Sequence, residues 1–411
     1  MATRAPQSFF AASGQERKMR AGGEFSETRE LCSTSGSPNS FSYGYDALDR
    51  LTSVAPPGST QLFGYTYDKV GNRLGSVTSG ASTTYTYPTG SHRLSGLSGA
   101  QTMSYAYDAN GNQTGAGSVT WAYGGNNRPI SVATASTTTF AINALGQRVR
   151  KAAGSTATRF VYDEAGRLLG EYDDTGALLQ ETVWLDDLPV ATIRPDGTST
   201  ALFYVHPDHL GTPRAVTRPG DNQLVWKWDN TEPFGNSAPD ENPSGLGVFA
   251  FNLRFEGQYF DSEAGLSYNY YRDYDPSIGR YVQSDPIGLK AGVNTYGYVL
   301  GNPLLWFDPF GLYSACLLQE QKCTDSKVVY GSLYLTKFEV CTRRKCRWRC
   351  YHDPGIGPKS CYNIPCKDGN CQFDHGVEVV EFHTGKQQLP FEAAPLCEDV
   401  NPADRKGRGS K

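Results

Sequence analysis

Residues 65–74 read Tyr65-Thr66-Tyr67-Asp68-Lys69-Val70-Gly71-Asn72-Arg73-Leu74, and the expected fold of the chain follows from their spacing. Its two tyrosines lie two positions apart, so a β-strand would place both rings on one face. Asp68 ends that strand, and Gly71 permits the positive φ that a tight turn requires. Arg73 and Leu74 then begin a returning strand. The stretch therefore predicts a β-hairpin with one aromatic face.

The same unit recurs along the chain. Clear copies begin at three further aromatic residues: Tyr43, Tyr105 and Phe160. Weaker copies lie at Tyr85 and around Tyr123, and Gly146-Gln147-Arg148 keeps only the second half of the unit. Because an isolated hairpin is marginally stable, we expect the units to pair edge to edge in one long sheet that closes or spirals. The predicted fold class is all-β, with the Tyr, Asp and Gly positions shaping the sheet rather than performing chemistry.

The composition agrees with a sheet and limits the partners. The 411 residues include 25 Tyr and 45 Gly, and 19% are charged, which favours strands and tight turns. A net charge of −4 makes no case for nucleic acid or membrane as a partner of the whole chain. No apolar stretch approaches the length of a membrane span, and the first residues hold no signal-peptide core. We expect a protein that stays in the cytoplasm until delivery or leaves through a secretion-system carrier.

Cysteine is distributed unevenly. Cys32 is the only cysteine before residue 316, although the chain has 10. The others gather in the last 96 residues: Cys316, Cys323, Cys341, Cys346, Cys350, Cys361, Cys366, Cys371 and Cys397. Such a break in composition predicts a boundary between two unlike modules.

A longer string follows the repeats. It includes His206-Pro207-Asp208-His209-Leu210-Gly211-Thr212-Pro213, Tyr274-Asp275-Pro276 and Asp308-Pro309-Phe310-Gly311-Leu312. Together with the repeats, over about residues 40–312, it resembles the YD-repeat proteins: bacterial Rhs proteins, the C components of Tc toxins and the shell of teneurins. The resemblance implies part of a spiral β-shell. We expect these regions: a poorly ordered segment 1–39, a YD-repeat shell 40–253, an Rhs-associated core 254–312, and a small, cysteine-rich, mainly β tail 313–411.

The resemblance also implies self-cleavage at the end of the core. The family pattern Pro-x4-Asp-Pro-x-Gly-Leu marks an aspartyl-type autoprotease that cuts after the leucine, and residues 303–312 match every fixed position. The implied scissile bond is Leu312–Tyr313, next to the start of the cysteine-rich tail.

Two carboxylates suit this reaction on chemical grounds. Peptide hydrolysis needs one group to activate water and another to donate a proton, and two neighbouring carboxyl groups can divide these roles. Asp285 and Asp308 both stand in Asp-Pro-x-Gly-Leu strings, and we predict that a loop through residues 294–298 brings them together. Arg280 is predicted to orient one carboxylate or to stabilise the oxyanion. The alternative is that both strings simply form turns, which Pro and Gly favour.

Another group of residues resembles a metal site. His206, Asp208 and His209 are metal-ligand types, but no further segment supplies a partner. We therefore interpret them as a turn with hydrogen-bonded imidazoles, and we predict no metal and no cofactor.

The tail carries partial signals of function. The basic stretch 341–350 holds Trp348 and suits either nucleic-acid contact or a solvated edge strand. The absence of a Cys-x2-Cys pair favours a disulfide-stapled domain over a zinc ribbon. Acids and imidazoles form a candidate nuclease or other hydrolase site: His375, Glu378, Glu381 and His383.

Two classes of function follow from these patterns. The first is a polymorphic toxin component whose shell cuts itself after Leu312 and releases the tail as an effector, with an immunity protein as the partner of the tail. The second is a non-catalytic cell-surface or secreted binding protein with a stapled tail. A further alternative is an orphan fragment of a larger Rhs protein. The intact string 303–312 favours the first class.

Overall fold

The computed structural model describes residues 16–19, 25–32, 38–56 and 61–312, together with strand backbone within 315–388. Side chains before residue 41 and after residue 312 lie outside this description. The chain divides into two compact units, Ala12–Tyr313 and a second made of Ser314–Lys411 with Met1–Ala11. Each unit is described by itself.

The first unit is dominated by one antiparallel meander of 21 strands, in which each strand pairs with the next along the chain. Its first strands are β1 Glu16–Met19, β2 Phe25–Cys32, β3 Pro38–Tyr45, β4 Leu51–Ala55, β5 Phe63–Tyr67, β6 Arg73–Thr78, β7 Ala81–Thr86, β8 Gly96–Gly99, β9 Met103–Tyr107 and β10 Gln113–Ala116. The later strands are β11 Val119–Tyr123, β12 Pro129–Ala133, β13 Thr137–Ile142, β14 Arg148–Ala153, β15 Thr156–Tyr162, β16 Leu168–Asp173, β17 Leu178–Leu185, β18 Leu188–Asp196, β19 Ser199–Pro207, β20 Pro213–Thr217 and β21 Leu224–Lys227. The all-β prediction is confirmed for this unit.

The hairpin turns show why the repeat needs Asp and Gly. Between β5 and β6, Asp68 Oδ1 accepts hydrogen bonds from the backbone N–H groups of Val70 (2.9 Å) and Asn72 (2.8 Å). Gly71 adopts a φ of 87°, a region that favours glycine. In the first repeat Asp49 takes the same place with a φ of 59°. The aspartate side chain and the left-handed residue together close the turn.

The second tyrosine of the unit joins neighbouring hairpins. Tyr67 Oη donates to the carbonyl of Leu51 (3.0 Å), and Tyr162 Oη donates to the carbonyl of Arg148 (3.0 Å). Each acceptor is the first residue of the returning strand in the preceding repeat. The recurring tyrosine therefore ties successive repeats together.

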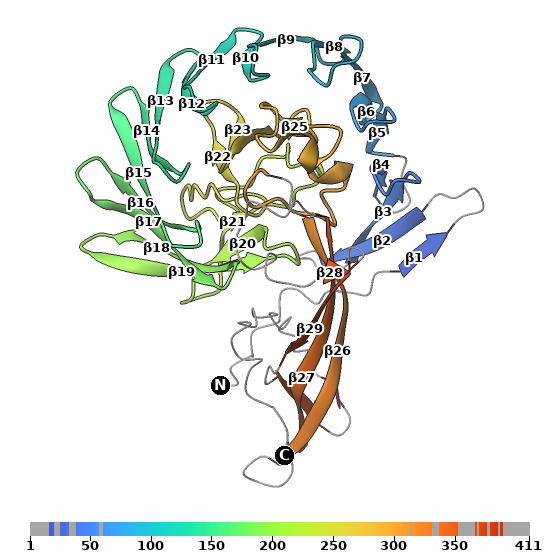
Figure 1. The fold of residues 1–411 in the computed structure, drawn as a ribbon. Helices are drawn as coiled ribbons and strands as arrows, with labels where there is room; N and C mark the ends of the chain where they lie inside the picture. Colours follow the sequence, from blue (N-terminus) through green and yellow to red (C-terminus); the bar gives the residue numbers. More distant parts are fainter. Residues whose placement is uncertain are drawn as a thin grey trace, which may run out of the picture. The chain divides into compact units, whose positions relative to one another are not determined.

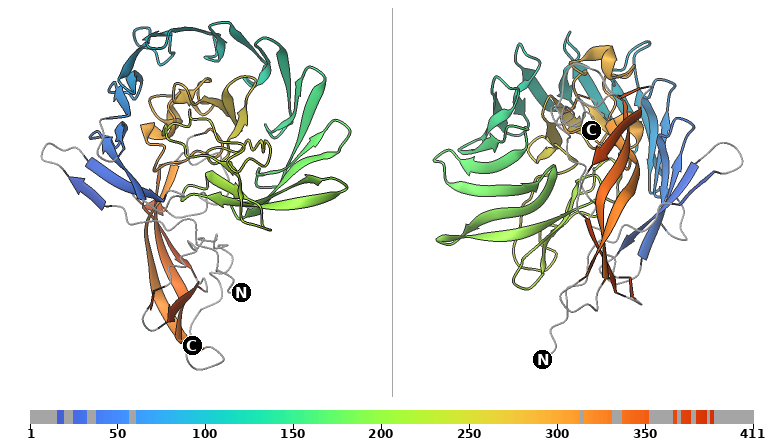
Figure 2. Two further views of the ribbon diagram at one scale, coloured as in Figure 1. Left: turned by 180° about the vertical axis from the view of Figure 1, so that it is seen from behind. Right: turned by 60° about the horizontal axis from the view of Figure 1, so that its bottom comes forward.

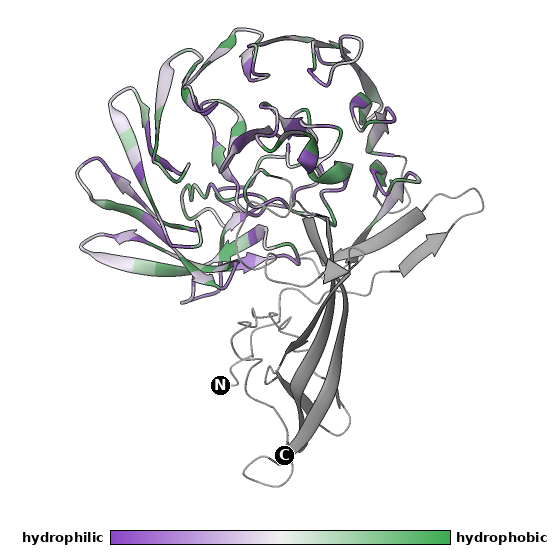
Figure 3. Ribbon diagram, in the orientation of Figure 1, coloured by the Kyte–Doolittle hydropathy of each residue, from purple (hydrophilic) through white to green (hydrophobic). Residues whose placement is uncertain are grey.

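A second, four-stranded sheet lies at the centre of residues 254–312, the segment that we call the core. Its elements are β22 Tyr259–Asp261, β23 Leu266–Asn269, β24 Arg272–Asp275 and β25 Arg280–Tyr281, followed by the 3-10 helices η1 Gly288–Ala291 and η2 Val299–Gly301. Figures 1 and 2 show the long meander curving around this sheet. Leu266 and Val282 of the core pack with Trp121 and Val132 of the meander. In β7, Thr83 and Tyr85 are buried while their neighbours are exposed, as expected for a sheet that buries one face. Figure 3 shows hydrophobic and hydrophilic stretches along the same strands of the meander.

Several repeat turns form hydrogen bonds with the core. The first turn contacts it where Asn302 Nδ2 donates to the carbonyl of Asp49 (2.8 Å), and the last where His209 Nε2 lies 3.1 Å from the carbonyl of Leu304. Turns between them also contact the core: Asn72 accepts from Asn294 (3.1 Å) and Gly111 from Tyr296 (2.7 Å). The first and the last of these repeat turns therefore both contact the short segment from Asn302 to Leu304.

One expectation about the repeats is revised by the structure. The unit at Gly146 is complete, because Asn143 replaces the aspartate and its Oδ1 accepts from the N–H groups of Leu145 and Gln147 (3.0 Å each). Strands β1 and β2 and the first two residues of β3 fall within residues 1–39, and the other residues of that segment lie outside the described residues, so its expected poor order stays a prediction. Within the described part of the chain, no helix has the length and apolar character to span a membrane.

The second unit contributes the backbone of a further antiparallel sheet. Its strands are β26 Ala315–Tyr330, β27 Lys337–Tyr351, β28 Cys366–Lys367, β29 Asn370–His375, β30 Val379–Thr384 and β31 Gln387–Gln388. β27 pairs with β26, β29 and β30. These strands are the described part of the predicted β tail, whose cysteine side chains lie outside the description.

Candidate functional site

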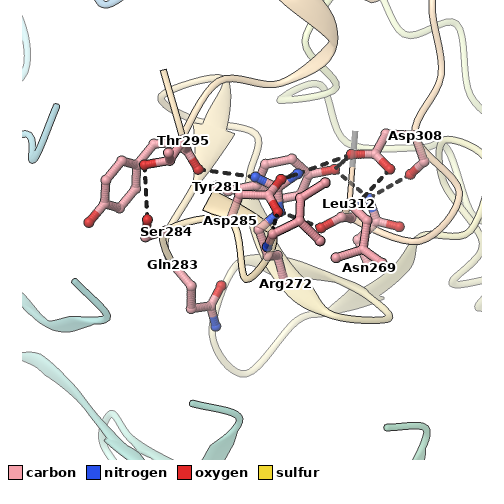
Figure 4. Close-up of polar contacts among 12 residues, drawn as sticks. Asn269, Arg272, Tyr281, Gln283, Ser284, Asp285, Thr295, Asp308 and Leu312 are labelled. Carbon is pink, nitrogen blue, oxygen red and sulfur yellow. Dashed lines mark hydrogen bonds and ion pairs between the residues drawn. The ribbon is translucent and has the colours of Figure 1, made fainter. Parts of the chain in front are cut away.

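Three side chains from separate parts of the core meet at one point (Figure 4). Arg272 begins β24, Asp285 follows β25, and Asp308 follows η2. Nη2 of Arg272 lies 2.8 Å from Asp285 Oδ2 and 3.2 Å from Asp308 Oδ2. At most 1% of each side chain is exposed. The structure therefore brings together the two carboxylates that the sequence singles out, with one guanidinium between them.

The chain reaches this arrangement by folding back after Asp285. The backbone N–H of Asp285 donates to the carbonyl of Thr295 (2.8 Å), and that of Tyr281 donates to the carbonyl of Tyr296 (3.0 Å). This return runs through the loop expected from the sequence. Asp285 Oδ1 also accepts the N–H of Ile287 (3.0 Å), so the residue forms a turn as well as an ion pair.

Asp308 is surrounded by donors. Tyr281 Oη donates to Asp308 Oδ2 (2.7 Å), and the backbone N–H of Leu312 donates to Asp308 Oδ1 (3.0 Å). Asn269 Nδ2 donates to Tyr281 Oη (2.8 Å) and to the backbone carbonyl of Asp308 (2.9 Å). Cζ of Arg272 lies 3.6 Å from the centre of the Tyr281 ring. These contacts fix one carboxylate oxygen of Asp308 at the residue that precedes the expected scissile bond.

Asp285 has an environment that favours its protonated form. Its pKa is raised to about 6, first by burial and in smaller part by the charge of Asp308, while Arg272 and the N–H of Ile287 act in the opposite direction. Its contact with Arg272 has the distance of an ion pair but not the angle of a hydrogen bond, so the attraction is mainly electrostatic. A carboxyl group with a pKa in this range suits proton donation near neutral pH.

The residues before the expected scissile bond are held tightly. Arg272 Nε donates to the carbonyl of Gly311, and the side chain of Leu312 is buried. Gly311 has a φ of 65°, and a Cβ at that position would lie 2.5 Å from the carbonyl oxygen of Asn269. Both the backbone conformation and the available space therefore require glycine. Tyr313, which follows the expected bond, lies outside the described residues.

Arg280 lies away from the two carboxylates, which corrects its expected role. Its Nη1 donates to Tyr87 Oη (2.9 Å), and its Nη2 donates to the carbonyl of His92. Both partners belong to the shell, so Arg280 joins the shell to the core. Arg272, which sequence reasoning did not select, takes the place between the carboxylates.

The histidine-rich group at residues 206–209 forms a repeat turn. Asp208 Oδ1 accepts the N–H of Leu210 (2.9 Å), as the turn aspartates of other repeats do. His206 Nε2 lies 2.9 Å from Thr217 Oγ1. Over the residues that the structure describes, no group of His, Cys, Asp and Glu is arranged to hold a metal ion. The contacts agree with the interpretation of these residues as a hydrogen-bonded turn.

The tail candidates are placed only by their backbone. His375 lies in β29, and Glu381 and His383 lie in β30. Both strands pair with β27, so the three residues belong to one sheet. Glu378 lies outside the described residues. The hydrolase site of the tail stays a prediction.

Comparison with known proteins assigns the family. The family model described as teneurin YD-shell matches residues 23–181 and 192–296, which is more than half of the chain. The chain belongs to this YD-shell family. The matched residues include Arg272 and Asp285, while Asp308 and Leu312 follow the end of the match.

Two bacterial toxins share parts of the YD-shell sequence. "Double-stranded DNA deaminase toxin A" of Burkholderia cenocepacia is 30% identical over 66% of this chain and 20% of that protein. "Toxin protein Tse5" of Pseudomonas aeruginosa is 40% identical over 30% of this chain and 9% of that protein. The crystal structure of TcdB2-TccC3-TEV aligns with a TM-score of 0.46 and 17% identity, over 71% of this chain and 18% of that chain. The chain thus spans one fifth or less of the length of each.

Proposed function

We propose that this YD-shell chain is the terminal part of the shell of a polymorphic toxin, and that it cuts itself after Leu312. The observation that carries the proposal is the hydrogen bond from the Leu312 N–H to Asp308 Oδ1, in a site where a second buried carboxyl group, that of Asp285, shares Arg272. The similarity to two toxins supports the toxin role.

In the proposed reaction, water attacks the carbonyl carbon of Leu312. Asp308 accepts a proton from the water, and protonated Asp285 donates its proton to the carbonyl oxygen. Collapse of the tetrahedral intermediate returns the proton to Asp285 and breaks the bond to Tyr313, whose nitrogen receives the proton held by Asp308. Arg272 fixes both carboxyl groups and, through Nε, the carbonyl of Gly311.

The tail is the proposed effector. The two compact units divide between Tyr313 and Ser314, one residue after the proposed scissile bond, which supports a separate cargo. Its candidate residues His375, Glu378, Glu381 and His383 make a nuclease or another hydrolase the class to test first. An immunity protein that binds the tail and a secretion-system carrier complete the proposal.

A denaturing gel of the purified full chain tests the cleavage. The wild-type chain should run as a shell band and a tail band, and Asp285→Asn and Asp308→Asn as one intact band each. Asp273→Asn is a matched control, because Asp273 is a buried carboxyl group in β24 that contacts Gln283 rather than Arg272. The control should split like the wild type. An Asp308→Asn chain that splits at the wild-type rate would contradict the proposal.

A growth assay tests the effector role with the same variants. Cells that produce the wild-type chain should stop growing, and cells that produce Asp308→Asn should grow, because the tail stays attached. Normal growth in both cases, with an oxidised and protease-resistant tail, would instead favour the binding-protein alternative.

A further inference from the structure

Phe310 is the third residue on the N-terminal side of the proposed scissile bond. Its side chain lies between a turn of the shell and the core. Its ring meets the Tyr270 ring edge-on, with centroids 5.2 Å apart. The backbone N–H of Tyr271 donates to the Phe310 carbonyl (3.0 Å). On the shell side, a Cβ built on Gly166 would lie 3.4 Å from Phe310 Cε1 and 3.1 Å from Tyr270 Cε2. The rings of Phe310 and Tyr270 therefore both face this shell repeat turn.

The shell turn that meets Phe310 is stiff. Asp163 Oδ1 accepts the N–H groups of Ala165 (2.9 Å) and Arg167 (2.8 Å), and the N–H of Gly166 donates to the Asp163 carbonyl (3.1 Å). Arg167 Nε also donates to Asp163 Oδ2 (2.6 Å). Because these bonds fix the turn, a methyl group added at Gly166 must displace the Tyr270 ring, and through it the Phe310 ring that packs on Tyr270.

Tyr270 is also held in an unusual conformation. Its φ is 55°, a left-handed value that few residues other than glycine adopt. Such conformations persist where surrounding contacts impose them, and they gather at functional sites. The ring contact with Phe310 and the hydrogen bond between the next residue, Tyr271, and the Phe310 carbonyl supply such contacts.

We propose that the turn of residues 163–167 is part of the substrate-binding site of the self-cleavage reaction, and that it positions Phe310 together with Tyr270. Phe310 is then a specificity-determining residue, although the motif leaves its position free. Cleavage follows only when this shell repeat has docked on the core, so an unfinished shell does not release its tail. This inference rests on the proposed self-cleavage.

The chain provides a matched control for this contact. Gly176 closes a turn of the same type: Asp173 Oδ1 accepts the N–H groups of Thr175 (2.8 Å) and Ala177 (2.9 Å). Gly176 and Gly166 have the same φ of 87°. A Cβ on Gly176 would meet nothing within 4 Å. Alanine at either position therefore carries the same backbone strain, and only Gly166→Ala presses on facing rings, first on Tyr270 at 3.1 Å and then on Phe310 at 3.4 Å.

The test measures the rate at which freshly synthesised full chain splits, alongside its melting temperature. Gly166→Ala should split roughly tenfold more slowly than Gly176→Ala, because small displacements of a reacting group cost large factors in rate. Both variants should lose thermal stability through the shared backbone strain, and Gly166→Ala should lose more because its methyl group also presses on the facing rings. A Phe310→Leu substitution should reduce the penalty of Gly166→Ala to less than threefold, since the smaller side chain leaves room for the methyl group.

Equal splitting rates for folded Gly166→Ala and Gly176→Ala would overturn the inference. If Gly166→Ala does not fold, Phe310→Ala is the test, because it removes the ring that faces the turn and leaves the turn itself unchanged. It should split about tenfold more slowly than the wild type, and a wild-type rate would overturn the inference. Asp308→Asn is assayed in parallel: if it splits normally the proposed self-cleavage fails, whereas an intact Asp308→Asn with equal glycine variants rejects only the role of the turn.

Discussion

Asp285 and Asp308 approach the same nitrogen of Arg272, at 2.8 and 3.2 Å, although they stand on separate segments of the core. One guanidinium carries a single positive charge, so it does not neutralise two buried carboxylates. Under such conditions a pair of carboxyl groups tends to hold one proton between them. The raised pKa of Asp285 agrees with its being the group that carries the proton.

Arg272 and Arg280 give a direct test of which arginine serves the site. Arg272→Lys should slow self-cleavage by about a hundredfold or more, because a lysine lacks the separate donors that reach the carboxylates and the Gly311 carbonyl. Arg280→Lys should change the rate by only a few fold, because Arg280 contacts Tyr87 and His92 instead. The rate of splitting of purified chain provides the measurement. If Arg280→Lys cleaved itself more slowly than Arg272→Lys, the assignment of Arg272 to the site would be contradicted.

The pH dependence of cleavage should reflect Asp285. Its pKa is raised to about 6, so the proton that it donates is present below that pH and lost above it. Cleavage should therefore accelerate as the pH falls from about 8 and level off below about 6. The free energy of unfolding should depend on pH in the same direction. The raised pKa of Asp285 stabilises the fold at low pH, and this contribution is lost as the pH rises through about 6. A rate that increases with pH would contradict the role of Asp285 as the acid.

The shell could be predicted from the sequence because its repeat depends on local chemistry. Asp68 and Gly71 close a turn within five residues, and the Tyr-x-Tyr spacing sets one face of a strand. The unit at Asn143 did not stand out in the sequence, because it lacks the aspartate that marks the other repeats. Its asparagine nevertheless makes the same turn contacts as an aspartate. The contacts of the first and last repeat turns with Asn302 and Leu304 join distant segments, and no local pattern specifies them.

The two aspartates of the site could be predicted from the sequence, but its arginine could not. The repeated Asp-Pro-x-Gly-Leu strings point to Asp285 and Asp308, whereas the choice of arginine depends on strand register. Tyr281 faces Asp308, so its neighbour Arg280 must face the other way. Tyr281 pairs with Tyr274, and Arg272 lies two residues before Tyr274, on the same face.

The docking of the shell on the core should depend on one buried ion cluster. Asp261 of the core pairs with Arg148 and with Lys151 (3.1 Å), and each of these side chains is at most 10% exposed. Asp261→Ala leaves two buried cations without this partner and should lower the free energy of unfolding by about 3–5 kcal/mol. Denaturant unfolding of the Asp308→Asn chain, which stays intact, gives the measurement.

The exposed pair of Arg150 and Asp174 is the control for that experiment. These side chains are 38% and 41% exposed, and water screens their attraction. Asp174→Ala should leave the unfolding midpoint unchanged. Equal losses from Asp174→Ala and Asp261→Ala would show that burial of the cluster does not stabilise the docked core.

Cleavage of its own chain after Leu312 is the proposed activity of the folded YD-shell. The most direct measurement is the intact mass of the full chain after denaturation, together with the N-terminal sequence of the smaller product. The wild-type chain should give two polypeptides, the smaller beginning at Tyr313, and Asp308→Asn a single species of 44.9 kDa. A folded wild-type chain that stays at 44.9 kDa, or a product that begins at another residue, would rule out self-cleavage after Leu312.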